Sequence, residues 1–177
     1  MKNFNWIIIG CLTILLGCGN GTDDGKMSKE EIKHTQEKLV EENKNNVSEE
    51  KQTMLKYLKD NNLQTTETGT GLNYIITEEG EGNKAEQGQV VKVHYAGRFL
   101  DGKIFDSSYD RGEPIDFPLG QGKVIKGWDE GLALLNEGAK ATLIIPSHLA
   151  YGPNGIPNTI PPSATLIFDV ELVEILN

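Results

Sequence analysis

The chain has 177 residues, of which 37% are hydrophobic and 24% charged, an ordinary composition for one globular domain with an extension. Its formal net charge of −9 argues against nucleic acid as a partner, because binding to phosphate backbones requires a surface rich in Lys and Arg.

The first 17 residues have the features of a bacterial lipoprotein signal peptide. Residues 6–16 are apolar but too few to cross a membrane as a helix. Leu15-Leu16-Gly17-Cys18 then resembles the lipoprotein box, in which the Cys thiol is acylated, for example with palmitate, and the chain is cut just before it. We therefore expect Cys18 to carry a lipid anchor. The alternative is an ordinary signal peptide that contains a cysteine by chance.

Cleavage before Cys18 would leave a domain that cannot form an intrachain disulfide. Cys11 lies inside the expected signal peptide, and Cys18 would be capped by lipid. The fold then depends on its hydrophobic core, and thiol-based catalysis is excluded. The expected location is the bacterial cell envelope, on the outer membrane, at its periplasmic face or at the cell surface. The oligomeric state is left open.

Residues 18–27 are expected to be a flexible tether, because residues 19–26 offer no apolar side chain to bury. Residues 28–63 are expected to form a helical extension. Ser28 to Glu31 fits a capping box, and Ser48-Glu49-Glu50 begins a second candidate helix. Both candidates are mostly polar, which favours a solvated spacer over a dimer contact or a helix docked on the main domain.

Residues 70–177 change to short strands and one helix, which predicts an α+β domain. Alternating apolar residues predict strands over 72–77, 89–96, 141–145 and 164–172, with short strands around Phe105 and Phe117.

Trp128, Leu132 and Leu135 would share one face of a short helix that follows residues 124–127. We expect the strands to curl around this helix. The gap between sheet and helix is then an apolar pocket, with the Trp128 indole as its floor.

Five stretches stand in a distinctive order: Val93-His94-Tyr95, residues 101–108, residues 124–128, Ala150-Tyr151-Gly152, and Ile160-Pro161-Pro162 followed by residues 164–172. In order and spacing they resemble the FKBP-type peptidyl-prolyl cis-trans isomerases, from Leu72 to the end of the chain. The resemblance implies an antiparallel sheet wrapped around one short central helix, and it implies no cofactor and no metal.

Carried over position by position, the resemblance implies a substrate pocket made of Tyr95, Phe105, Asp106, Phe117, Val124, Ile125, Trp128, Tyr151, Ile160 and Phe168. It implies that catalysis rests on six of them: Asp106, Tyr151, Trp128, Phe168, Phe105 and Tyr95. The chain departs from the commonest family pattern at the rim of the pocket, at Ile115, Lys123, Ile156 and Thr159.

The implied activity is rotation of X-Pro bonds in exported proteins, without a covalent intermediate. Proline-containing polypeptides are the expected clients, and macrolide inhibitors are expected to bind in the same cavity. Asp106 is expected to act electrostatically on the twisted carbonyl or, alternatively, only to tie down Tyr95 and Arg111. Two other functions stay open: a proline-segment binding module or chaperone with little turnover, and a surface-exposed interaction protein.

Overall fold

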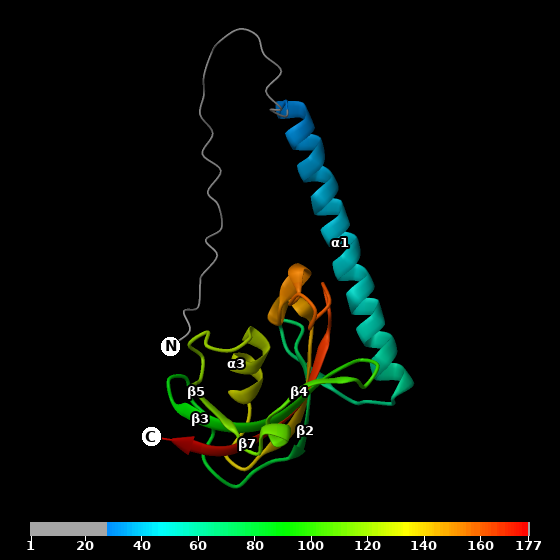
Figure 1. Ribbon diagram of the computed structural model, residues 1–177. Helices are drawn as coiled ribbons and strands as arrows, with labels where there is room; N and C mark the ends of the chain where they lie inside the picture. Colours follow the sequence, from blue (N-terminus) through cyan, green and yellow to red (C-terminus); the bar gives the residue numbers. More distant parts are fainter. Residues whose placement is uncertain (1–27, 177) are drawn as a thin grey trace, which may run out of the picture. The chain divides into compact units, whose positions relative to one another are not determined.

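The computed structural model describes residues 28–176 and shows a seven-stranded antiparallel sheet with one long and several short helices (Figure 1). The expected signal peptide, the lipidation site Cys18 and the tether up to residue 27 lie outside the described residues. The elements are α1 (Lys29–Asp60), β1 (Thr66–Glu67), β2 (Asn73–Glu78), β3 (Val90–Phe99), β4 (Ile104–Ser107), α2 (Ser108–Arg111), β5 (Ile115–Pro118), α3 (Lys126–Leu132), β6 (Lys140–Ile145), η1 (Ser147–Leu149), η2 (Gly152–Asn154) and β7 (Leu166–Leu176).

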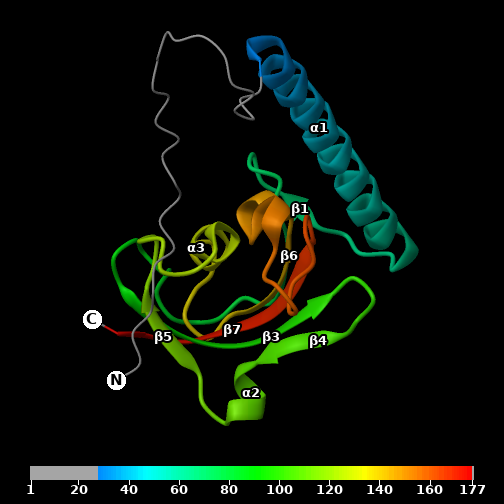
Figure 2. The same cartoon turned by 45° about the horizontal axis from the view of Figure 1, so that its top comes forward.

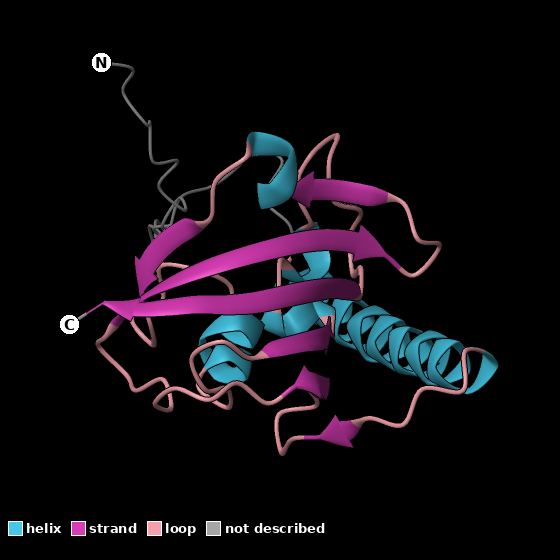
Figure 3. Cartoon of the chain, turned by 90° about the horizontal axis from the view of Figure 1, so that it is seen from below, coloured by secondary structure: helices cyan, strands magenta, loops and turns pink. Residues whose placement is uncertain are grey.

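The strands follow the order β1-β2-β6-β7-β3-β4, and β5 pairs with β3 beyond the end of β4. The two longest strands, β3 and β7, lie side by side in the centre of the sheet (Figure 3). Seen from another side, the sheet curves beneath α3 (Figure 2). The predicted fold class, an antiparallel sheet wrapped around one short helix with a helical extension before it, is confirmed.

Strict alternation along β3 explains how this strand presents two different faces. Val91, Val93 and Tyr95 are buried in the main core, whereas Lys92 and His94 on the other face are only half-buried. Successive residues of a strand point to opposite faces, so this period of two places one row of side chains toward α3.

Helix α3 lies close to β6 because two glycines face that strand. A Cβ at Gly127 would come within 2.4 Å of Ile145 Cγ2, and one at Gly131 within 2.7 Å of Leu143 Cδ1. Residues four apart share a helical face, so both close approaches occur on one side of the helix. The helix ends at Leu132, so Leu135 of the predicted apolar face lies almost one turn beyond its end.

Helix α1 runs without interruption from Lys29 to Asp60, so the second helix start predicted at Ser48 is wrong. The segment contains neither Pro nor Gly to break it. The predicted capping box is confirmed: the Ser28 N–H donates to Glu31 Oε2 over 2.7 Å, and the Glu31 N–H donates to Ser28 Oγ over 3.2 Å. Neither α1 nor any other helix within residues 28–176 has the length and apolar character needed to cross a bilayer.

By its internal contacts the chain divides between Gln36 and Glu37, and the part from Glu37 onward contains the remainder of α1, the sheet and α3. In this part, Met54 and Leu58 of α1 pack against Ile144 and Ile167 of the sheet. Their neighbours in β6 and β7 face the main core, so α1 covers the opposite face of the sheet. The docked helix is therefore the alternative that the structure bears out for this segment.

Candidate active site

A pocket of about 190 Å³ opens between α3 and the sheet. Side chains from β3, β4, β5, β7, α3 and two loops form its lining: Tyr95, Phe105, Asp106, Ile115, Lys123, Val124, Ile125, Trp128, Tyr151 and Phe168. All but two of the predicted pocket residues are among them, so the structure brings together segments that lie far apart in the sequence.

Phe117 and Ile160 are the two predicted pocket residues outside this lining. Both belong to the main core, with exposed fractions of 7% and 4%. Phe117 points inward from β5 and lies behind the pocket floor, with its ring centroid 5.8 Å from that of Trp128. Ile160 is held by two backbone hydrogen bonds of 2.8 Å with Ile156. Their position supports the pocket from behind.

Aromatic rings form the floor and walls of the pocket. The Trp128 indole stands nearly perpendicular to the rings of Tyr95 and Phe168, with centroids 4.9 Å and 5.3 Å away. Phe105 in turn meets Phe168 edge-on at 5.6 Å. Such edge-to-face arrangements are the favoured geometry of aromatic pairs. Among the described residues nothing accepts a hydrogen bond from the buried Trp128 Nε1, so packing alone holds this ring.

Gly97 makes room for these walls, and sequence reasoning missed it. It lies in β3 on the same face as Tyr95 and pairs with Asp106 on one side and Phe168 on the other. A Cβ here would come within 2.7 Å of Phe105 Cζ and 2.8 Å of Phe168 Cε1. The signal was available in the sequence as a glycine interrupting a strand pattern, which often marks a close approach.

Asp106 is fixed by two donors at the pocket wall. The Tyr95 hydroxyl donates to Asp106 Oδ2 over 2.5 Å, and Arg111 Nη1 donates to Oδ1 over 2.5 Å. Arg111 Nη2 also donates to the Tyr95 hydroxyl over 2.7 Å. Burial acts to raise the pKa of Asp106, but these hydrogen bonds outweigh it and the pKa lies below its ordinary value. The carboxylate is therefore ionised at neutral pH.

Tyr151 stands at the mouth of the pocket with 39% of its surface exposed. Burial and the negative charge of Asp106 raise the pKa of its phenol, so the hydroxyl keeps its proton at neutral pH. This hydroxyl makes no hydrogen bond to another residue within 28–176 and is available to a ligand.

The loop before α3 is held by a residue that sequence reasoning did not single out. The two carboxylate oxygens of Asp129 accept hydrogen bonds from the N–H groups of Gly120 (2.8 Å) and Gly122 (2.9 Å). Both glycines have positive φ, +71° and +66°. These two hydrogen bonds fix the start of the segment that brings Val124 and Ile125 to the pocket.

The departures from the family pattern divide into two groups. Ile115 and the exposed Lys123 line the pocket. Ile156 and Thr159 lie outside it, in the turn that closes on Ile160. Of the four, only Ile115 and Lys123 therefore belong to the wall of this cavity.

Comparisons with family models, with known protein sequences and with solved structures all indicate the same family. Residues 81–173 match the family model described as FKBP-type peptidyl-prolyl cis-trans isomerase. The probable FKBP-type peptidyl-prolyl cis-trans isomerase FkpA of Neisseria meningitidis is 44% identical over 146 residues, which cover 81% of this chain and 53% of that protein. The peptidyl-prolyl cis-trans isomerase FPR2 of Saccharomyces cerevisiae is 60% identical over 93 residues, which cover 52% of this chain and 69% of that protein.

Among solved structures, the crystal structure of FkpA from Escherichia coli aligns with a TM-score of 0.66 at 39% identity, covering 85% of this chain and 74% of that one. For the Neisseria relative the matched part is smaller: this chain spans about half of that protein, 53% of its length.

Proposed function

The chain belongs to the FKBP-type peptidyl-prolyl cis-trans isomerase family, and from this premise we propose that it accelerates rotation about X-Pro peptide bonds. The observation that carries this proposal is the pocket itself. An indole floor, aromatic walls and one fixed carboxylate converge on a cavity of about 190 Å³. A cavity of this kind has room for a prolyl residue with its flanking amide.

The reaction needs no nucleophile. The barrier to rotation of an X-Pro bond arises from amide resonance and amounts to about 18–20 kcal/mol. At the twisted transition state the carbonyl has lost conjugation with the nitrogen. Water hydrogen bonds favour the planar, charge-separated amide, so an apolar cavity that excludes water favours the twisted form. Each tenfold acceleration requires about 1.4 kcal/mol of such preference.

Each side chain then has a distinct role. The Trp128 indole is the floor under the proline ring, with Phe105 and Phe168 as walls. The Ile125 N–H, at the N-cap of α3, donates to a substrate carbonyl, and the Tyr151 hydroxyl holds the substrate backbone. These contacts fix the prolyl bond in the orientation in which it twists.

Asp106 acts through its charge in this mechanism. Its pKa is lowered by hydrogen bonds from Tyr95 and Arg111, which hold the carboxylate in its ionised form. A fixed negative charge beside the twisting carbonyl interacts with the change in its dipole. The same hydrogen bonds also suit the alternative, in which Asp106 serves only to hold Tyr95 and Arg111 in place.

The proposal extends to clients and location. Proline-containing segments of exported proteins are the proposed substrates, and macrolide inhibitors are proposed to occupy the same cavity. The lipoprotein box at residues 15–18 supports a lipid anchor at Cys18 and a place on the bacterial envelope membrane. Mass spectrometry of the membrane fraction, looking for an acylated N-terminal Cys18, tests the anchor separately from the activity.

A protease-coupled assay with a proline peptide tests the activity. We expect acceleration of the cis-to-trans step by the purified protein and its suppression by a macrolide such as rapamycin. Trp128→Ala should abolish most of the turnover, because the floor of the pocket is lost. An unaccelerated reaction, or a Trp128→Ala protein as active as its parent, contradicts the proposal.

Lys123 favours a second candidate function. This exposed cation lines the pocket at a position where an acidic or amide residue is frequent in the family. It suits retention of acidic, proline-containing client segments with little turnover. Client binding that persists in Asp106→Ala and Tyr151→Phe, while turnover disappears, would favour this binding function.

A further inference from the structure

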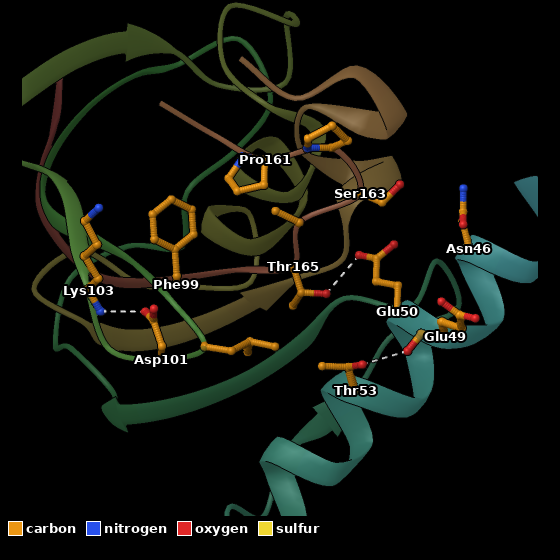
Figure 4. Close-up of a pocket in the computed structure, with 13 residues that line it drawn as sticks. Asn46, Glu49, Glu50, Thr53, Phe99, Asp101, Lys103, Pro161, Ser163 and Thr165 are labelled. Carbon is orange, nitrogen blue, oxygen red and sulfur yellow. Dashed lines mark hydrogen bonds between the residues drawn. The ribbon is translucent and has the colours of Figure 1, made fainter. Parts of the chain in front are cut away.

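The carboxylate of Glu50 in α1 contacts both ends of the loop that carries Tyr151. Glu50 Oε1 accepts hydrogen bonds from the Ser147 N–H (2.5 Å) and the Thr165 hydroxyl (2.8 Å), and Oε2 accepts one from the Ser147 hydroxyl (2.6 Å). Ser147 and Thr165 are buried, with exposed fractions of 6% and 5%. Figure 4 shows Glu50 reaching from the helix to Thr165 beside an open groove.

The segment between these two contacts belongs to the active site. It leaves the sheet after β6 at Ser147 and returns to it just before β7 at Thr165. Tyr151, which it carries, lines the pocket.

The inner part of this loop is bonded mainly to itself. Ile156 and Ile160 exchange backbone hydrogen bonds of 2.8 Å, and the Ser163 N–H donates to the Gly152 carbonyl over 3.1 Å. These bonds hold the inner part of the loop together, and the buried Leu149 and Ile160 attach it to the main core, so the Glu50 contacts add the anchoring of its two ends.

Glu50 is itself held on a firm support. Met54 lies four residues later, on the same face of α1, and is buried to 3% exposure against the sheet. One turn further, the Tyr57 hydroxyl accepts a 3.1 Å hydrogen bond from Arg98 Nη1 in β3. Hydrogen bonds to an ionised carboxylate are about twice as strong as those between neutral groups. The helix therefore offers a fixed point from which both loop ends are held.

We propose that Glu50 is a positioning residue for the isomerase site, which fixes the loop that presents Tyr151 to the pocket. This inference rests on the proposed function and assigns a role to the helical extension within it. Active-site groups lose much of their effect when they are displaced by about 1 Å, so the support of a loop affects turnover without touching substrate. Leu149, buried to 6% exposure, also anchors the loop, so loss of Glu50 loosens it without releasing it.

Glu50→Ala tests this role, with Glu49→Ala as the matched control. Both variants remove one negative charge from the same turn of α1, but Glu49 is exposed and only Glu50 accepts hydrogen bonds from the loop. We expect kcat/KM for a proline peptide to fall about tenfold in Glu50→Ala and to stay unchanged in Glu49→Ala. Glu50→Gln, which keeps one acceptor oxygen, should fall between them.

A double-mutant cycle separates positioning from general stability. If Glu50 acts through Tyr151, the loss caused by Tyr151→Phe should be clearly smaller in the Glu50→Ala background than in the parent. Additive losses overturn the proposal, because they show that the two residues act independently. Equal kcat/KM in the Glu49→Ala and Glu50→Ala proteins overturns it as well.

Hydrogen exchange provides a readout that does not depend on turnover. Amides of residues 148–163 should exchange faster in Glu50→Ala than in the parent, whereas those of β3 and β7 should not change. Unchanged exchange in the loop contradicts the proposal. A parent protein without isomerase activity contradicts the proposed function, while the exchange data still decide whether Glu50 holds the loop. If Glu50→Ala does not fold, Thr165→Val, which removes one of the three hydrogen bonds, is judged by the same loop exchange.

Discussion

The Tyr95 hydroxyl donates a 2.5 Å hydrogen bond to Asp106 Oδ2, and this bond joins the central strand of the sheet to the charged wall of the pocket. Arg111 completes the arrangement by donating to both groups. Its guanidinium also lies 5.4 Å from the centre of the Tyr95 ring. The negative charge of Asp106 is thus fixed in place at the edge of an apolar cavity.

Replacement of Asp106 separates a charge effect from a packing effect. Asp106→Asn keeps the size of the side chain and removes its charge, so we expect kcat/KM to fall about tenfold or more if the charge acts on the twisted amide. Tyr95→Phe removes the hydrogen bond to Asp106 and the one from Arg111 Nη2, but it leaves the carboxylate charged and paired with Arg111 Nη1, so its loss should be smaller. Peptide isomerase assays on both variants measure the difference.

Thermal melts of the same variants provide the control. If Asp106 serves only to hold Tyr95 and Arg111, the order of the two variants in turnover should follow their order in Tm. A turnover loss in Asp106→Asn no larger than that in Tyr95→Phe contradicts the electrostatic role.

Turnover should be nearly independent of pH between about pH 6 and pH 9. Hydrogen bonds lower the pKa of Asp106 in spite of its burial, so it stays ionised there. Burial and the charge of Asp106 raise the pKa of Tyr151, so its hydroxyl stays protonated. A bell-shaped profile of kcat/KM within this range contradicts the mechanism, because it reveals an acid or base that titrates.

Acid should remove the stability that Asp106 contributes. Because its folded pKa is depressed, the contribution is present above the unfolded value of about 3.9 and is lost as the pH falls through the folded pKa. The difference in unfolding free energy between parent and Asp106→Asn should therefore shrink below about pH 4. Urea unfolding at a series of pH values measures it, and a difference that stays constant into acid contradicts the assignment.

Gly97→Ala should damage the pocket without touching any charged group. The new methyl group would come within 2.8 Å of both Phe105 and Phe168, and both rings would have to move. We expect kcat/KM and macrolide affinity to fall about tenfold or more, because the walls of the cavity shift.

Gly69→Ala is the matched control for that substitution. Gly69 is exposed, and a Cβ there would meet nothing within 4 Å. The macrolide affinity of the Gly69→Ala protein, measured by fluorescence titration, should equal that of the parent. Full activity in Gly97→Ala would contradict this prediction, because it would show that turnover does not depend on the positions of the Phe105 and Phe168 rings.

Much of the sheet could be predicted from the sequence because its signals are local. The alternation of Val91, Val93 and Tyr95 is visible within a few residues, and so is the apolar face that contains Trp128 and Leu132. The pocket required more, since Tyr95, Trp128 and Phe168 meet only when strands far apart in the chain pair. The resemblance to a family supplied that arrangement, and the periodicity alone did not.

The features that escaped prediction depend on contacts across the fold. Gly97 matters because of two rings from neighbouring strands, and Asp129 because it accepts from glycines in the preceding loop. Glu50 meets Ser147 and Thr165 about a hundred positions later in the chain, separations of 97 and 115 residues. A polar helix gives no local sign of such partners, so its composition alone predicts a solvated spacer, whereas the structure docks it on the sheet.

Docking of α1 should be measurable as stability. Met54 is buried to 3% exposure against Ile144 and Ile167, so Met54→Ala removes apolar contacts and leaves a cavity. We expect a loss of about 2–5 kcal/mol in the free energy of unfolding. Urea denaturation followed by tryptophan fluorescence, which reports on Trp128, measures it.

Leu39→Ala provides the comparison on the same helix, because Leu39 has 53% of its surface exposed. Its effect should stay within about 0.5 kcal/mol. Equal and small effects at Met54 and Leu39 would mean that the packing of α1 on the sheet contributes nothing to the free energy of unfolding. The helix would then not be a fixed base from which Glu50 can hold the loop. A large effect confined to Met54 shows that the extension folds together with the isomerase domain, which is the condition under which a helix outside the pocket can act on it.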